Sequence, residues 1–364
     1  MKLGIVGLPN VGKSTLFNAI TKASAEVANY PFCTIEPNIG LVNVPDERLN
    51  ILTKMHESKK TVPATIEFFD IAGLVKGAGK GEGLGNKFLS NIKETDAIVE
   101  VLRCFEDENI THVDGSVDPI RDIETINYEL IYSDLELVDK ILPKREKVAR
   151  ADKNARVEVE VLKKIKNVLE NEKNASSANL NEEEKKLIKA YQFLTTKPII
   201  YVCNVSEDEL SDANNNENVN KVKEYAKKEK SHVTVVSAKA ELEISQLENE
   251  TEKKEFFEIL GIKNSGLDDL IKDSYKTLNL ISFLTTGKDE TRAWTINKGS
   301  TALEAAGKIH TDIQRGFIKA EIINFDKLEE VGSLQKAKEL GLLRQEGKEY
   351  IMQDGDVTNF KFNV

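Results

Sequence analysis

The chain has 364 residues, of which 40% are hydrophobic and 31% are charged, and its formal net charge is -10. This length fits two or three domains, and the acidic balance argues against a surface coated uniformly for nucleic acid. The three cysteines have no metal-like spacing, and the sequence shows neither a signal-peptide pattern nor an apolar run near the roughly 18 residues of a membrane span. We therefore expect a cytoplasmic protein without membrane or DNA partners.

A phosphate-binding loop comes first. Residues 7–14, "GLPNVGKS", match G-x-x-x-x-G-K-[ST], with a short apolar strand before them and an amphipathic helix after them. Gly7 and Gly12 let backbone N–H groups face phosphate oxygens, and Lys13 adds a positive charge at the β- and γ-phosphates. The predicted nucleotide-binding residues here are Asn10, Val11, Gly12, Lys13, Ser14 and Thr15, and Lys13 is also predicted to be catalytic.

A magnesium site is predicted from three oxygen donors. Ser14 follows the lysine of the loop, Asp70 ends the apolar strand "IEFFD", and Thr34 lies in the turn-rich segment "YPFCTIEPN". We expect Ser14 and Thr34 to bind Mg²⁺ directly and Asp70 to bind it through water, while the N–H of Gly73 meets the γ-phosphate. Residues 25–40 and 73–90 are expected to change conformation with nucleotide state.

The residue that usually orients the attacking water is replaced. Ras-like enzymes carry a glutamine directly after D-x-x-G, where this chain has Leu74. An apolar side chain cannot position water, so hydrolysis must be slow or must use another group. His112, in a polar loop after the strand "AIVEVLR", is the nearest alternative, although an ordinary surface-loop histidine fits the same pattern.

Residues 127–196 form a predicted insertion. Apolar residues recur at helical spacing over 126–142 and 157–169, Pro143 is expected to break the first helix, and Asn181 is expected to cap a third. These apolar stripes must be buried against each other, which favours an antiparallel coiled-coil arm. The basic segment 144–156 lies near the expected tip, where it is either a solvated helix end or a contact for ribosomal RNA.

The base-binding loops follow two further buried strands. "IIYVC" delivers Asn204-Val205-Ser206-Glu207 to the place where guanine-specific proteins carry Asn-Lys-x-Asp, and "HVTVV" precedes Ser237, Ala238 and Lys239. Val205 and Glu207 both weaken a guanine-reading site, whereas Asn204 can still serve the N6/N7 edge of adenine.

The last part of the chain changes pattern. Short strands, a helix over 300–310 and a final hairpin around residues 354–356 predict a small mixed sheet that clasps a helix. The sequence therefore predicts an α/β fold. A mostly parallel GTPase-like P-loop NTPase sheet carries the inserted helical coiled-coil arm and is followed by a C-terminal β-grasp domain.

Long collinear segments resemble the YchF family of Obg-like ATPases. They include "GIVGLPNVGKSTLFNAIT", "ANYPFCTIEPNIGLVNVPDERL", "FFDIAGLVKGA" and, near the C-terminus, "YIMQDGDVTNFKFNV". The resemblance implies a nucleotide-binding domain over 1–277, interrupted by the arm, and a TGS domain over 280–363. It also implies catalysis by His112, a possible K⁺ ligand in Asn10 and a base contact by the backbone of Val205.

The same resemblance implies a function. Members of the family prefer ATP to GTP, hydrolyse it to ADP and phosphate and bind ribosomes, so the expected partners are ATP and a ribosome (a large subunit or 70S-type particle), contacted through the arm and the TGS domain. Candidate TGS contacts are Lys298, Lys308, Arg315 and Lys319. Two alternatives remain: a GTPase of ribosome assembly, and a nucleotide-gated ribosome-binding protein with negligible turnover.

Overall fold

The computed structural model describes residues 1–24, 38–71, 84–113, 115–247 and 249–363. These residues form two compact units. The first comprises 1–41 and 67–270, and the second comprises 42–66 and 271–364. The chain crosses between them three times, within the strands β2 (Ile39–Asn43) and β4 (Thr65–Asp70) and within the helix α10 (Gly266–Thr277).

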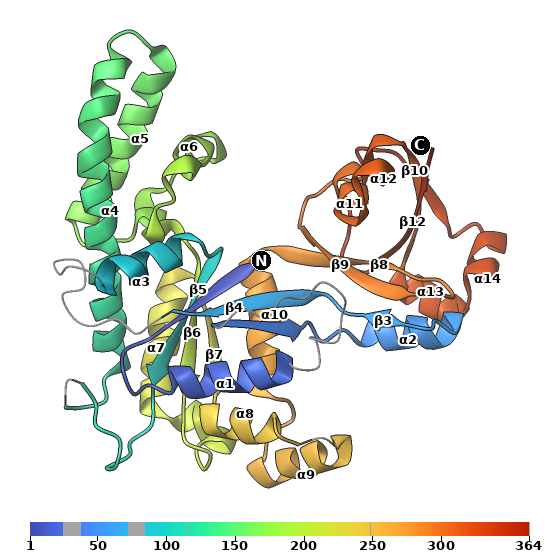
Figure 1. The fold of residues 1–364 in the computed structure, drawn as a ribbon, viewed down its shortest axis with the longest axis horizontal. Coiled ribbons are helices and arrows are strands. Elements are labelled where there is room, and N and C mark those ends of the chain that lie inside the picture. The colour runs from blue at the N-terminus through green and yellow to red at the C-terminus, as the bar shows by residue number, and fades with distance from the viewer. Residues whose placement is uncertain (25–37, 72–83, 114, 248, 364) are drawn as a thin grey trace. The chain divides into compact units, whose positions relative to one another are not determined.

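The first unit is built on a six-stranded sheet with the order β2-β4-β1-β5-β6-β7 (Figure 1). Neighbouring strands from β4 to β7 pair in parallel. The other strands are β1 (Lys2–Val6), β5 (Ala97–Arg103), β6 (Ile199–Asn204) and β7 (His232–Val236). The central strands β5 and β6 are buried along their whole length, as expected for a parallel sheet covered on both faces.

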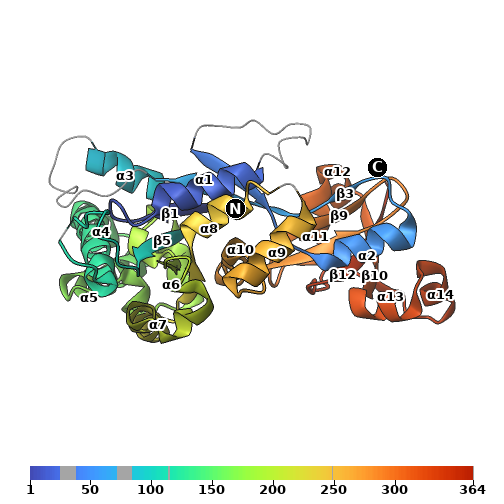
Figure 2. The same cartoon turned by 90° about the horizontal axis from the view of Figure 1, so that it is seen from below.

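Helices surround this sheet. They are α1 (Lys13–Ser24), α3 (Leu84–Lys93), α7 (Glu217–Glu229), α8 (Ala238–Ile244), α9 (Glu250–Leu260) and α10 (Gly266–Thr277). Helices α1 and α8 lie side by side, so the phosphate loop and the end of β7 are neighbours (Figure 2). The predicted P-loop fold is therefore present.

The insertion forms an antiparallel helical pair, α4 (Pro119–Ala149) and α5 (Lys153–Glu170), followed by α6 (Glu182–Ile188) (Figure 1). Its apolar stripes pack on each other around Val138, Leu162 and Ile165. Asn181 caps α6 in a capping box, as predicted. The basic segment 144–156 spans the end of α4, the turn and the start of α5.

The prediction that Pro143 ends the first helix of the arm is wrong. Pro143 lies inside α4, which continues to Ala149. Proline removes one backbone hydrogen bond, to the carbonyl of Asp139, but Pro143 is exposed and water can satisfy that carbonyl. Packing of α4 against α5 keeps the chain helical despite the lost hydrogen bond.

The second unit contains a mixed sheet with the order β11-β10-β12-β8-β9-β3. Its strands are β3 (Thr61–Val62), β8 (Leu280–Thr285), β9 (Thr291–Asn297), β10 (Phe317–Asn324), β11 (Arg344–Glu346) and β12 (Asp356–Phe362). Its helices are α2 (Glu47–His56), α11 (Ala302–Ile309), α12 (Thr311–Arg315), α13 (Phe325–Val331) and α14 (Leu334–Glu339). Three alanines of α11 join the buried cluster around Phe283 and Phe317, so the predicted sheet clasping a helix is present.

Two features of this unit differ from the sequence-based expectation. No hairpin forms around residues 354–356, because β12 pairs instead with β10, antiparallel, and with β8, in parallel. Residues 42–66 were assigned to the nucleotide-binding domain, whereas the structure groups them with the C-terminal residues. The reason is that β3 extends the second sheet beside β9, and Arg48 of α2 binds Asp354 at 2.8 Å.

No helix of the described part of the chain is long and apolar enough to cross a membrane.

A glutamate is buried in the first sheet. Glu100 on β5 has no exposed surface, and neither carboxylate oxygen has a hydrogen-bond partner among the described residues. Burial, and then the charges of Glu229 and Asp122, raise the pKa of Glu100 well above its ordinary value. The unfolded chain ionises this group at lower pH than the folded one. Stability is therefore lost as the pH rises above about 4.5 toward the folded pKa.

We expect Glu100→Met to raise the free energy of unfolding by about 1–3 kcal/mol at pH 8, because it removes an unpaired buried polar group. The gain should shrink toward pH 5, where the part of the wild-type penalty that comes from the buried charge becomes small. Urea denaturation at both pH values measures it, with the exposed Glu94→Met as the control. An equal gain at both values, or a loss, would contradict the explanation.

Candidate functional site

The phosphate loop joins the end of β1 to the first residue of α1. Gly12 has φ +94° and Asn10 has φ +64°, both in the left-handed region. A Cβ atom on Gly12 would lie 2.1 Å from the Nδ2 atom of Asn204, and one on Gly7 would lie 2.8 Å from the carbonyl oxygen of Val101. The loop therefore needs glycine at position 12 for both conformation and space, and at position 7 for space.

Lys13 and Asp70 meet at the mouth of this loop. The Lys13 ammonium forms an ion pair with the Asp70 carboxylate, although the two residues are 57 positions apart. Parallel pairing of β1 with β4 brings them together, with Ile5 opposite Asp70. Ser14 is exposed in the first turn of α1. A strand-end carboxylate and a hydroxyl supply the oxygen donors that Mg²⁺ prefers, so these residues fit the predicted metal site.

Three predicted residues of this region, Thr34, Gly73 and Leu74, lie outside the described residues. Their roles stay predictions.

Asn204 links the two loops expected beside the base. Its Nδ2 atom donates to the carbonyl of Val11 at 2.8 Å, and its Oδ1 atom accepts from the N–H of Ala238 at 2.9 Å. The side chain is 4% exposed. Asn204 therefore holds the phosphate loop against the start of α8, a role that the sequence analysis missed; its contact with the base stays a prediction.

Neighbouring residues of these loops are also engaged. The N–H of Val205 donates to the carbonyl of Val236 at 2.9 Å, so this N–H is used in the pairing at the ends of β6 and β7. Ser237 is the N-cap of α8. The carboxylate of Glu207 accepts from the Lys239 ammonium at 2.5 Å, and this hydrogen bond raises the pKa of Lys239.

His112 is buried instead of lying in an exposed loop. Its side chain is 3% exposed, and its Nε2 atom lies 3.0 Å from Oδ2 of Asp122, which is itself 1% exposed. Its Nδ1 atom lies 3.4 Å from a guanidinium nitrogen of Arg121. The surface-loop alternative is therefore wrong. No local pattern in the sequence indicates either partner, because the pairing depends on where the loop folds back on α4.

The loop that carries His112 also contacts the phosphate loop. The side chain of Asn10 donates through Nδ2 to the carbonyl of Thr111 at 3.1 Å. The K⁺ role predicted for Asn10 would use its side-chain oxygen. Burial raises the pKa of Asp122, while its hydrogen bonds with His112 and Arg121 lower it in part.

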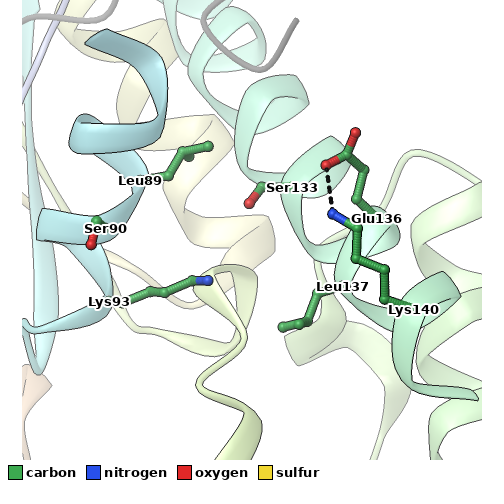
Figure 3. Close-up of a pocket in the computed structure, with 7 residues that line it drawn as sticks. All are labelled: Leu89, Ser90, Lys93, Ser133, Glu136, Leu137 and Lys140. Carbon is green, nitrogen blue, oxygen red and sulfur yellow. Dashed lines mark ion pairs between the residues drawn. The ribbon is translucent and has the colours of Figure 1, made fainter. Parts of the chain in front are cut away.

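A separate cavity of about 290 Å³ lies between α3 and α4 (Figure 3). Figure 3 shows Lys140 directed toward Glu136, with which it forms an ion pair of 3.6 Å, while Lys93 extends from α3 into the gap. None of the predicted site residues lines this cavity, and we assign no ligand to it.

Two family models match parts of the chain. A model described as "50S ribosome-binding GTPase" matches residues 2–138, and YchF-GTPase_C, described as a protein of unknown function (DUF933), matches residues 280–363. The chain is 59% identical over 362 residues to "Ribosome-binding ATPase YchF" of Bacillus subtilis (strain 168), a match that covers 99% of each protein.

The chain belongs to the YchF family. It is also 52% identical to the Escherichia coli O157:H7 protein of the same name, over all of this chain and 99% of that protein. The structure titled "Structure of the Schizosaccharomyces pombe YchF GTPase" superposes with a TM-score of 0.90 at 38% identity, covering 99% of this chain and 97% of the other. A GTP-binding protein from Pyrococcus horikoshii OT3, at 21% identity and a TM-score of 0.63, shares the fold. The prediction of a P-loop nucleoside triphosphatase is confirmed by the family and the fold.

Proposed function

We propose that this YchF-family protein is a Mg²⁺-dependent triphosphatase that prefers ATP to GTP, binds ribosomes and acts there as a nucleotide-dependent switch in translation. The observation that carries the choice of nucleotide is the ion pair between Glu207 and Lys239. The other parts of the proposal are supported by the phosphate loop, the basic arm and the printed names of the relatives.

Guanine would lose its usual recognition in this pocket. The guanine-specific motif places a short carboxylate against N1–H and the 2-amino group, whereas Glu207 is one methylene longer and already binds Lys239. Val205 is buried and has no ammonium or long stem to cover the base. Both changes remove contacts that favour guanine over adenine.

The triphosphate would be bound by side chains that now bind each other. Lys13 would exchange Asp70 for the β- and γ-phosphate oxygens, and Asp70 and Ser14 would then hold Mg²⁺, with Thr34 as the predicted third ligand. Mg²⁺, when bound, neutralises charge on the phosphate oxygens. The N–H groups of residues 10–15 and the start of α1 would bind the remaining phosphate charge.

A ribosome is the proposed partner because several relatives are named "Ribosome-binding ATPase YchF". The end of the arm suits phosphate-rich RNA despite the acidic total charge. Its exposed basic residues are Lys144, Lys147, Arg150, Lys153 and Arg156. In the second unit, which we propose is a TGS domain, Lys298, Lys308 and Arg315 are exposed, while Lys319 binds Gln345.

Competition between ATP and GTP for the purified protein tests the nucleotide preference. We expect tighter binding of ATP, and we expect the double variant Val205→Lys/Glu207→Asp to move the preference toward GTP by about 10-fold or more, since it restores both guanine-favouring residues. Lys227→Ala serves as the control, since Lys227 is an exposed lysine of α7. Equal or tighter binding of GTP by the wild type would favour the GTPase alternative.

A nucleotide-gated binding protein with negligible turnover is a second candidate, favoured by the burial of His112 between two partners. Turnover with and without ribosomes separates the two functions. Stimulation that His112→Ala abolishes supports the enzyme, whereas unchanged slow turnover with nucleotide-dependent ribosome binding supports the alternative.

A further inference from the structure

Both ring nitrogens of His112 are engaged by residues at the start of α4. Nε2 lies 3.0 Å from Oδ2 of Asp122 and Nδ1 lies 3.4 Å from Nη2 of Arg121. Arg121 also binds the other carboxylate oxygen of Asp122 at 3.3 Å, so each of the three side chains contacts the other two. The backbone carbonyl of Ser116 holds the same guanidinium at 2.6 Å.

The chemistry of these partners assigns the proton on the ring. An ionised carboxylate only accepts hydrogen bonds, so Nε2 carries the hydrogen; a guanidinium only donates, so Nδ1 presents its lone pair to Arg121. In this arrangement Nδ1 faces the Arg121 guanidinium. A histidine held in this way has no nitrogen directed at a water molecule.

We propose that Arg121 and Asp122 are positioning residues that hold the His112 ring away from the nucleotide, and we call this pair of residues the latch. Hydrolysis then requires release of His112 from the latch. The inference rests on the proposed catalytic role of His112. The latch is well placed for such a role, because Thr111, the residue before His112, is bonded to Asn10 of the phosphate loop. His112 is therefore one residue away from a direct contact with the phosphate loop.

Helix α4 supplies a route for control of the latch. Asp122 lies in its first turn, where Asp118 caps the helix by accepting from the N–H groups of Ile120 and Arg121 at 3.2 Å. The same helix continues for 31 residues to Ala149 at the end of the arm, a length of roughly 45 Å. A partner that shifts or rotates the arm would act directly on the residues that hold His112.

The test compares steady-state ATP hydrolysis by wild type and Asp122→Asn, without ribosomes. Asparagine keeps the shape but loses the charge that binds both the ring and Arg121, so we expect kcat to rise about 10-fold, with KM for ATP unchanged, as a minor released state gains population. Arg121→Gln is expected to act in the same direction. Asp118→Asn, which preserves the cap of the same helix, is the matched control and should leave kcat unchanged.

The double variant His112→Ala/Asp122→Asn should lose the increase in kcat. That result would show that Asp122 acts through the histidine. If kcat stays the same or falls in both Asp122→Asn and Arg121→Gln, with thermal unfolding close to that of wild type, the latch is overturned while the proposed function stands. If His112→Ala alone retains full turnover, the catalytic role of His112 fails and the latch fails with it.

Discussion

Replacement of Lys13 by alanine is expected to lower the rate of nucleotide hydrolysis by about 10²–10³-fold, because the phosphate loop loses the cation that would stabilise charge on the transferred phosphoryl group. The structure places this ammonium at the mouth of the loop, in an ion pair with Asp70. The contact with this carboxylate orients the ammonium before nucleotide arrives. Phosphate release from ATP measures the effect.

Lys22→Ala provides the control for this experiment, since Lys22 is an exposed lysine in the last turn of the same helix. The control should change hydrolysis by less than about 2-fold, in line with the small effects of most surface substitutions. Hydrolysis by Lys13→Ala within a few-fold of the wild type would mean that phosphate charge is stabilised by other groups. The proposed use of the loop would then need revision.

Replacement of Asp134 by alanine is expected to lower the free energy of unfolding by about 3–5 kcal/mol. Asp134 of α4 is 1% exposed and accepts from the N–H of Leu194 at 2.9 Å and from the N–H and hydroxyl of Thr195 at 2.8 and 2.7 Å. Alanine would leave these buried donors without their acceptor. The loss would detach the base of the arm from the segment that leads into β6.

Urea denaturation measures this loss, and Asp139→Ala supplies a matched control on the same helix. Asp139 is exposed and binds Lys166 at 2.6 Å on the surface, so its removal should cost about 0–1 kcal/mol. Similar costs for the two variants would show that the Asp134 contacts do not anchor the arm. A change in the denaturant slope would instead indicate that the arm unfolds separately.

The phosphate site was predictable because its signal is local. Eight consecutive residues, 7–14, specify the loop, and the flanking apolar residues specify the strand and helix that position it. Lys13, Ser14 and Asp70 occupy the strand end and helix start that the motif implied. The strands of the first sheet and the helices of the arm were predicted for the same reason, from apolar patterns within short windows, whereas the short strands β3 and β11 of the second sheet were not predicted.

Contacts between distant residues were not predictable in this way. Glu207 meets Lys239 across 32 positions, and Asn204 reaches Val11 across 193. His112 meets Asp122 only because the loop after β5 folds back on α4. Each of these pairs depends on which strands are neighbours and on how a loop returns, and a single sequence does not encode that as a local pattern.

The sequence alone determined the phosphate loop with Lys13 and Ser14, since backbone conformation over a few consecutive residues suffices to create it. The Asp70 carboxylate reaches this loop only through the pairing of β1 with β4. Tertiary structure decided the state of that chemistry. In the folded chain His112 is buried against Asp122, and Glu207 forms an ion pair with Lys239. Helix α4 continues past Pro143, and residues 42–66 belong to the second unit. The physical reason is that burial, pairing and strand order are properties of the packed chain, and they decide which of its polar groups are free to act.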